Sequence, residues 1–88
     1  MFPFTEKTKE NFVVRTFSPS VDPEELVWHR DKENRTIQAL NDSDWQFQLE
    51  DELPITLEKN TFVTVPKGVY HRIIKGTGEL KVGITKHI

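Results

Sequence analysis

The sequence predicts an all-β fold, a sandwich or barrel built from roughly eight short strands. Apolar and polar residues alternate with a period of two along most of the chain, which is typical of half-buried strands. Clusters of turn-forming residues interrupt this alternation at short intervals. Helix signals are weak: Asp22 and Pro23 offer a cap and a first helical position, but only for a single turn. The 88 residues suffice for one small domain.

The expected strands follow from this alternation and its interruptions. They cover residues 12–17, 26–31, 35–40, 45–49, 53–57, 61–65, 69–74 and 80–85. Pro54 removes a backbone donor, so its strand is expected at a sheet edge or a bulge. Trp45 and Phe47 alternate with glutamines, which predicts that both rings lie in the core. The third histidine, His87, is expected in a disordered tail.

The polar run Lys32–Asn34 is expected to be a three-residue hairpin loop. This hairpin would place Asp31 opposite Arg35 and His29 opposite Ile37. Asp31 and Arg35 would then attract each other across the two strands, and the guanidinium could hold the carboxylate through two hydrogen bonds.

Composition and charge narrow the classes of function. Cysteine is absent, so disulfides, thiolate catalysis and Cys-ligated zinc are excluded. The formal net charge is −2 and the basic residues are scattered, so no nucleic-acid partner is expected. The sequence shows neither a signal peptide nor a membrane-length apolar run, which predicts a cytoplasmic protein without a membrane partner. Trp28 and Leu26 are expected on the face opposite His29, where the N-terminal strand or a second subunit of a homodimer would cover them.

Two short segments suggest a common site. Residues 27–30 read VWHR and residues 69–72 read VYHR, so each presents a histidine at the same position of a strand. Residues 29 and 31 share one face of their strand, because side chains alternate. We therefore expect His29, Asp31 and His71 to meet in one pocket inside the β structure. Tyr70 should point to the opposite face.

The segment around His71 resembles the second motif of the cupins, small jelly-roll proteins. That motif reads Gly, five residues, Pro-x-Gly, two residues, His, three residues and Asn. Pro66, Gly68 and His71 occupy matching positions. Asn60 replaces the first glycine, and both residues tolerate a left-handed backbone conformation. Lys75 replaces the final asparagine.

The segment around His29 resembles the first cupin motif less closely. That motif contains His-x-His, then Glu, then Gly. His29 matches the first histidine and Asp31 takes the place of the second, while Arg35 stands where glutamate belongs and Asp42 where the closing glycine belongs. The resemblance extends over residues 27–84.

The resemblance implies a cupin-like double-stranded β-helix, or jelly-roll barrel, for residues 1–88. Residues 1–25 would form an N-terminal strand and linker, and residues 26–85 the barrel core. It also implies a divalent metal (Fe, Mn, Ni or Zn) held by His29, Asp31 and His71. Two histidines and a carboxylate match the facial triad of iron(II) sites, which keeps positions open for a substrate.

Two interpretations remain open at this point. In the first, the metal is bound and Arg35 or Arg72 binds a small polar or anionic ligand. If such a protein is an enzyme, oxygenation or isomerisation is the expected reaction. In the second, Asp31 pairs with Arg35, no metal binds, and the pocket senses or carries a small molecule. A structural or assembly role is a third class, based on Trp28 and Leu26.

Overall fold

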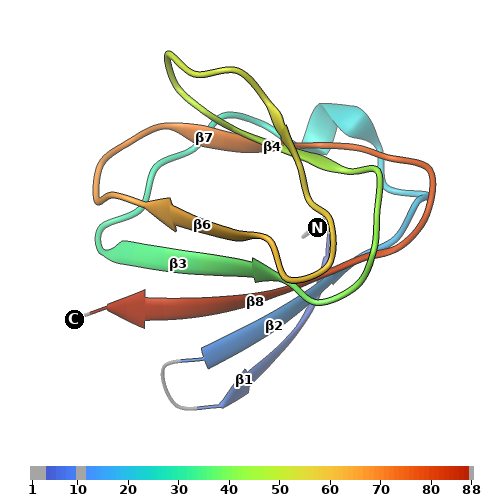
Figure 1. The fold of residues 1–88 in the computed structure, drawn as a ribbon, viewed down its shortest axis with the longest axis horizontal. Helices are drawn as coiled ribbons and strands as arrows, with labels where there is room; N and C mark the ends of the chain where they lie inside the picture. Colours follow the sequence, from blue (N-terminus) through green and yellow to red (C-terminus); the bar gives the residue numbers. More distant parts are fainter. Residues whose placement is uncertain (1–3, 10–11, 88) are drawn as a thin grey trace.

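The computed structural model describes residues 4–9 and 12–87, which form two antiparallel sheets and one short 3-10 helix (Figure 1). The elements are β1 (Thr5–Lys9), β2 (Phe12–Phe17), η1 (Pro23–Glu25), β3 (Asn34–Ala39), β4 (Gln46–Leu49), β5 (Ile55–Thr56), β6 (Phe62–Val65), β7 (His71–Ile74) and β8 (Leu80–His87). The five-stranded sheet has the order β1-β2-β8-β3-β6, and the three-stranded sheet the order β5-β4-β7. The all-β prediction is confirmed.

The sheets form because alternate residues of each strand face a shared core between them. Figure 1 shows β4 and β7 lying over the sheet that contains β3, β6 and β8. Trp45 and Phe47 are fully buried, as the alternation on β4 predicts. The other buried core residues lie on the five-stranded sheet, apart from Val21 and Leu57 in connecting segments: Val13, Phe17, Val21, Ile37, Ala39, Leu57, Val63, Val65, Leu80, Val82 and Ile84.

Local sequence signals account for several boundaries. The Asp22 carboxylate accepts a hydrogen bond of 3.0 Å from the Glu24 amide, so it caps the single helical turn that the sequence predicts. Pro54 precedes β5, an edge strand. Asn60 and Gly68 adopt left-handed φ angles of 71° and 79°, which both residue types tolerate.

The predicted hairpin between residues 26–31 and 35–40 is wrong. β3 pairs with β6 and β8 instead, and Arg35 lies opposite Val65 and Lys86. The preceding segment crosses to the other sheet, where His29 forms an isolated bridge with His71. Two hydrogen bonds hold the crossing segment against the turn after β6: Gly68 N–H to Asp31 O (3.0 Å) and Lys67 N–H to Asn34 Oδ1 (2.7 Å). These tertiary contacts replace the local pairing.

Three further details differ from the expectations. The strand expected over residues 53–57 is limited to β5. The additional edge strand β1 pairs with β2. His87 belongs to β8, and its Nε2 lies 2.8 Å from Thr36 Oγ1, so this part of the chain is anchored.

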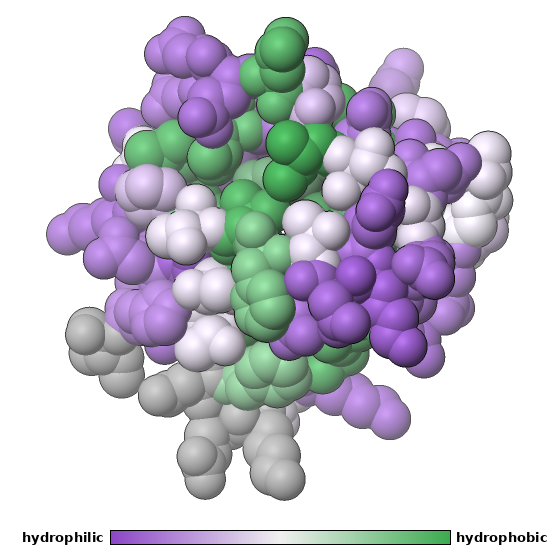
Figure 2. Space-filling model, viewed as in Figure 1, coloured by the Kyte–Doolittle hydropathy of each residue, from purple (hydrophilic) through white to green (hydrophobic). Residues whose placement is uncertain are grey.

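The surface carries several exposed hydrophobic side chains. They are Phe12, Val27, Trp28, Leu53, Ile55, Phe62 and Tyr70. Figure 2 shows a band of hydrophobic surface on one face, with hydrophilic surface on both sides of it. Among the described residues, no helix is long and apolar enough to cross a membrane.

Candidate metal and ligand site

The backbone brings the two histidines together. His29 and His71 exchange hydrogen bonds between their amides and carbonyls, at 3.0 and 2.8 Å. Side chains of such directly opposed residues lie on the same face. The imidazole centroids are therefore only 4.1 Å apart, with the rings inclined at 65°. His71 is 3% exposed and stacks on Phe47, whereas His29 is open to solvent.

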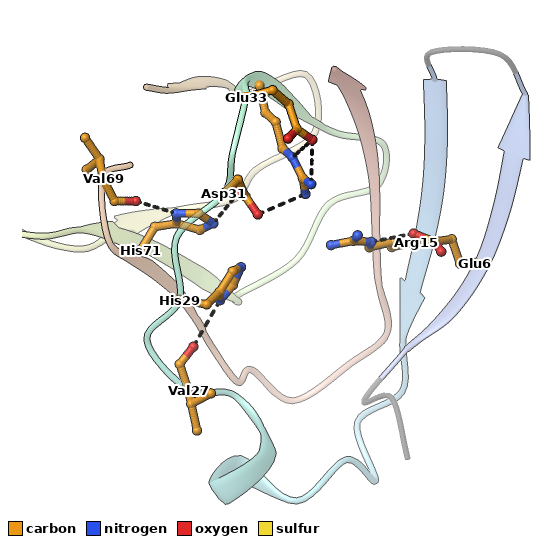
Figure 3. Close-up of polar contacts among 9 residues, drawn as sticks. Glu6, Arg15, Val27, His29, Asp31, Glu33, Val69 and His71 are labelled. Carbon is orange, nitrogen blue, oxygen red and sulfur yellow. Dashed lines mark hydrogen bonds and ion pairs between the residues drawn. The ribbon is translucent and has the colours of Figure 1, made fainter. Parts of the chain in front are cut away.

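Both imidazoles are oriented by a carbonyl two residues earlier in the chain (Figure 3). His29 Nδ1 lies 3.1 Å from Val27 O, and His71 Nδ1 lies 3.0 Å from Val69 O. Because a carbonyl only accepts hydrogen bonds, Nδ1 must carry the proton in each ring. In the neutral imidazole, Nε2 then has a free lone pair, which is the form that binds a metal.

Asp31 lies between the histidines and Arg35. Its Oδ1 is 3.3 Å from Arg35 Nη1, and its Oδ2 is 3.2 Å from His71 Nε2. Oδ2 is buried and has no hydrogen-bond donor in the described part of the chain. A neutral His71 with its proton on Nδ1 faces this oxygen with a lone pair, so two acceptors oppose each other. A cation between them would satisfy both atoms.

Arg35 is shared between two carboxylates. Its Nε and Nη2 donate to Glu33 Oε1 at 3.0 and 2.8 Å, while Nη1 contacts Asp31. The hydrogen bond from Arg35 lowers the pKa of Glu33, so Glu33 stays ionised. The two carboxylates offset the charge of the Arg35 guanidinium, which weakens the electrostatic objection to a cation next to Arg35.

Burial lowers the pKa of His71 below its ordinary value of 6.5. Desolvation, the largest cause, penalises the imidazolium, and the charges of His29 and Arg35 lower the pKa further, against the hydrogen bond to Val69 and the attraction of Asp31. His71 is therefore neutral at pH 7 and available as a ligand.

The donor set fits a divalent metal. One ligand atom from each of His29, Asp31 and His71 lies within 4.8 Å of the other two. Ligands bound to one such ion at about 2.0–2.2 Å lie at most about 4.4 Å apart, so small side-chain rotations suffice. Two imidazoles and a carboxylate suit iron, manganese, nickel or zinc and leave coordination positions open.

The three candidate ligands open into a cavity of about 410 Å³ between the sheets. Its walls are mostly apolar and include Phe17, Leu26, Ile37 and Ile73. This size falls in the range of small-molecule sites, which combine apolar walls with a few polar groups. The cavity can enclose a small organic molecule beside the candidate metal centre.

The structure brings Arg35 to the cavity but not Arg72. Arg35 is among the lining residues. Arg72 lies outside, with its guanidinium 4.6 Å from the centre of the Trp28 ring and its Nε donating to Gln48 Oε1 at 3.0 Å. The placement of Leu26 beside Trp28 is wrong: Leu26 lines the cavity together with His29. The predicted outward position of Tyr70 is confirmed, since this side chain is 40% exposed.

Sequence reasoning missed Arg15. It lies on β2, and its side chain lines the cavity. The signal was present in the alternation: Val13, Arg15 and Phe17 share one face of the strand, and Val13 and Phe17 are buried. A charged residue between two core residues indicates an inward-facing guanidinium.

No protein-family model and no curated protein sequence matches this chain. Solved structures do. An RmlC-like cupin with a double-stranded β-helix fold from Methanocaldococcus jannaschii superposes with a TM-score of 0.74 at 13% identity, covering 98% of this chain and 81% of that one. A cupin-2 domain protein from Shewanella frigidimarina gives 0.64 at 19% identity, with coverages of 91% and 76%.

FeII HppE, a larger protein, is also similar, with a TM-score of 0.71 at 15% identity. The match covers 96% of this chain but only 48% of FeII HppE. At these identities the likeness concerns the fold. The chain has the cupin double-stranded β-helix fold, as the resemblance in its sequence predicts.

Proposed function

We propose that this chain is a metal-binding cupin whose cavity binds or transforms a small polar molecule. His29, Asp31 and His71 would hold a divalent ion of the iron, manganese, nickel or zinc group. The observation that carries the proposal is Asp31 Oδ2, a buried oxygen without a hydrogen-bond donor among the described residues, 3.2 Å from a ring nitrogen of His71. Such an atom is costly unless a cation neutralises it.

Each group around the ion would have a distinct task. The carbonyls of Val27 and Val69 fix the imidazole orientations, and Arg35 fixes the carboxylate of Asp31 through Oδ1. Outer contacts of this kind orient metal ligands and tune them. The apolar walls would exclude water from the bound molecule. A bound ion would supply a Lewis acid with open positions.

The metal-free alternative explains less of the geometry. It assigns Asp31 to a salt bridge with Arg35, but that contact uses only Oδ1, and the shorter hydrogen bonds of Arg35 go to Glu33. The second oxygen would stay without a partner. The likeness to FeII HppE concerns the fold and not the reaction.

Metal analysis tests the proposal. Untagged protein, reconstituted separately with iron(II), manganese, nickel and zinc under anaerobic conditions, should retain close to one equivalent of at least one ion. His29→Ala and His71→Ala should each weaken binding by more than about 100-fold, beyond the 10- to 100-fold typical of losing an outer contact.

His87→Ala is the matched control, since His87 contacts Thr36 on β3 rather than the candidate ligands. It should bind the ion as the wild type does. Substoichiometric metal in the wild type after every reconstitution would favour the metal-free sensing or carrying role instead.

A further inference from the structure

Arg15 is a cavity-lining arginine whose polar contact within the described residues uses only its Nε, whereas every nitrogen of Arg35 has a partner. Its side chain is 19% exposed and lines the same cavity as His29, Asp31 and His71. Figure 3 shows its guanidinium pointing from the β2 side of the cavity toward the histidine–aspartate group. Charged side chains in such surroundings normally have partners for their polar atoms.

The partners of Arg15 leave one edge of the guanidinium open. Its Nε donates to Glu6 Oε1 at 2.8 Å, and its planar face lies 4.4 Å from the centre of the Phe4 ring. Within residues 4–9 and 12–87, its two Nη groups have no acceptor. Arginine has five N–H donors, so the Nη edge keeps four of them. Glu6 and Phe4 hold the group in place from one edge and one face.

Arg35 differs in this respect. All three of its nitrogens are engaged, Nε and Nη2 by Glu33 and Nη1 by Asp31. Arg35 therefore serves the carboxylates of the protein, although the sequence predicts Arg35 or Arg72 as the residue that holds a ligand. An anion in the cavity could pair with the open Nη edge of Arg15 without displacing a protein partner.

We infer that Arg15 holds the carboxylate of the ligand, and that the ligand is a small carboxylic acid with an apolar body. The open guanidinium edge suits the two oxygens of a carboxylate. The apolar walls of the cavity, including Phe17, Ile37 and Phe47, suit an apolar body. This inference rests on the proposed function, since it specifies the molecule that would lie beside the candidate metal centre.

Binding of matched acids and amides tests the inference. Hexanoate and benzoate, with hexanamide and benzamide as neutral matches, are titrated into full-length protein, and NMR shifts give the dissociation constants. Each acid should bind about 10- to 100-fold more tightly than its amide, the range expected for hydrogen bonds to a charged group. Arg15→Met should remove this preference, because acid binding should weaken far more than amide binding.

Further variants make the result specific. Arg15→Lys keeps the charge and should restore part of the acid preference. Arg30→Met is the matched control, because Arg30 is exposed over the Tyr70 ring and does not line the cavity. An acid preference that survives Arg15→Met, or acids that do not bind the wild type at all, would overturn the inference.

Metal binding is measured separately, which keeps the two proposals distinguishable. If the wild type binds no metal but Arg15 still sets the acid preference, the metal centre fails while the ligand assignment stands. If metal binds and Arg15→Met leaves acid affinity unchanged, the ligand assignment fails and the metal centre stands. Arg15→Met should retain the wild-type metal affinity within about twofold, because Arg15 contacts none of the three candidate ligands in the described structure.

Discussion

At the scale of single residues, Asp31 shows how a contact can be predicted while its geometry is not. The sequence predicts an ion pair between Asp31 and Arg35, and the pair forms at 3.3 Å. It joins residues four apart in a crossing segment and β3, not residues facing each other across a hairpin. Opposite charges this close in sequence can meet in several backbone conformations. The sequence could not show that Glu33 would take the other two nitrogens of Arg35.

Buried His71 predicts a pH dependence of stability in the metal-free protein. Burial lowers the pKa of His71 in the folded state, while the unfolded chain has the ordinary value near 6.5. Below about pH 6.5 the unfolded chain therefore binds more protons. The free energy of unfolding should fall as the pH drops from about 6.5 toward the lowered pKa of His71.

Urea unfolding between pH 5 and 8, with a chelator present, measures this effect. His71→Gln should flatten the part of the curve below pH 6.5, and His87→Gln, at the exposed end of β8, should retain it. Parallel curves for the wild type and His71→Gln would mean that this imidazole does not govern the acid side.

At the scale of elements, alternation predicts strands better than it predicts their partners. The alternation of Trp45 and Phe47 with glutamines predicts a strand here with one buried face, and both rings lie in the core. Partner choice depends on contacts distant in sequence. Lys67 N–H binds Asn34, and Gly68 N–H binds the Asp31 carbonyl, so the chain changes sheets where a local hairpin looked sufficient. Nothing in the residues between 31 and 35 reveals those partners.

The turn between β7 and β8 packs closely against Asp44 and Trp45. Trp45 Nε1 donates to Gly78 O at 2.6 Å, and Asp44 accepts hydrogen bonds from the backbone and side chain of Thr77. A Cβ on Gly76 would lie 2.7 Å from the Trp45 backbone nitrogen and 2.6 Å from its Cδ1, and would also meet Asp44 Oδ1. Backbone atoms cannot swing aside as a flexible side chain can.

Gly76→Ala should therefore destabilise the protein by about 1–3 kcal/mol, the usual cost of overpacking. Gly78→Ala is the control in the same turn, because a Cβ there meets nothing within 4 Å. Chemical denaturation of both variants gives the comparison. Equal stability of the two would show that the turn relaxes around Gly76 at little cost.

At the scale of the whole molecule, the outer side of the β4–β7 region combines aromatic, basic and acidic side chains. Two arginine–aromatic pairs lie on the surface, Arg72 with Trp28 at 4.6 Å and Arg30 with Tyr70 at 5.2 Å. Trp28 and Tyr70 also border a shallow groove with the acidic turn 50–52. Arginines and carboxylates on one face allow a second copy, related by a two-fold axis, to pair each charge with its opposite.

This arrangement gives a specific test of the predicted homodimer. Sedimentation of the wild type should give the mass of two chains, and Trp28→Glu should give that of one, because the new carboxylate would be buried against the acidic turn of the other copy. Phe62→Glu is the control: Phe62 is an exposed aromatic residue on β6, at an edge of the other sheet, and its replacement should leave the mass unchanged. A dimer that tolerates Trp28→Glu must use another surface, and the arginine–aromatic pairs would then be features of a solvated face.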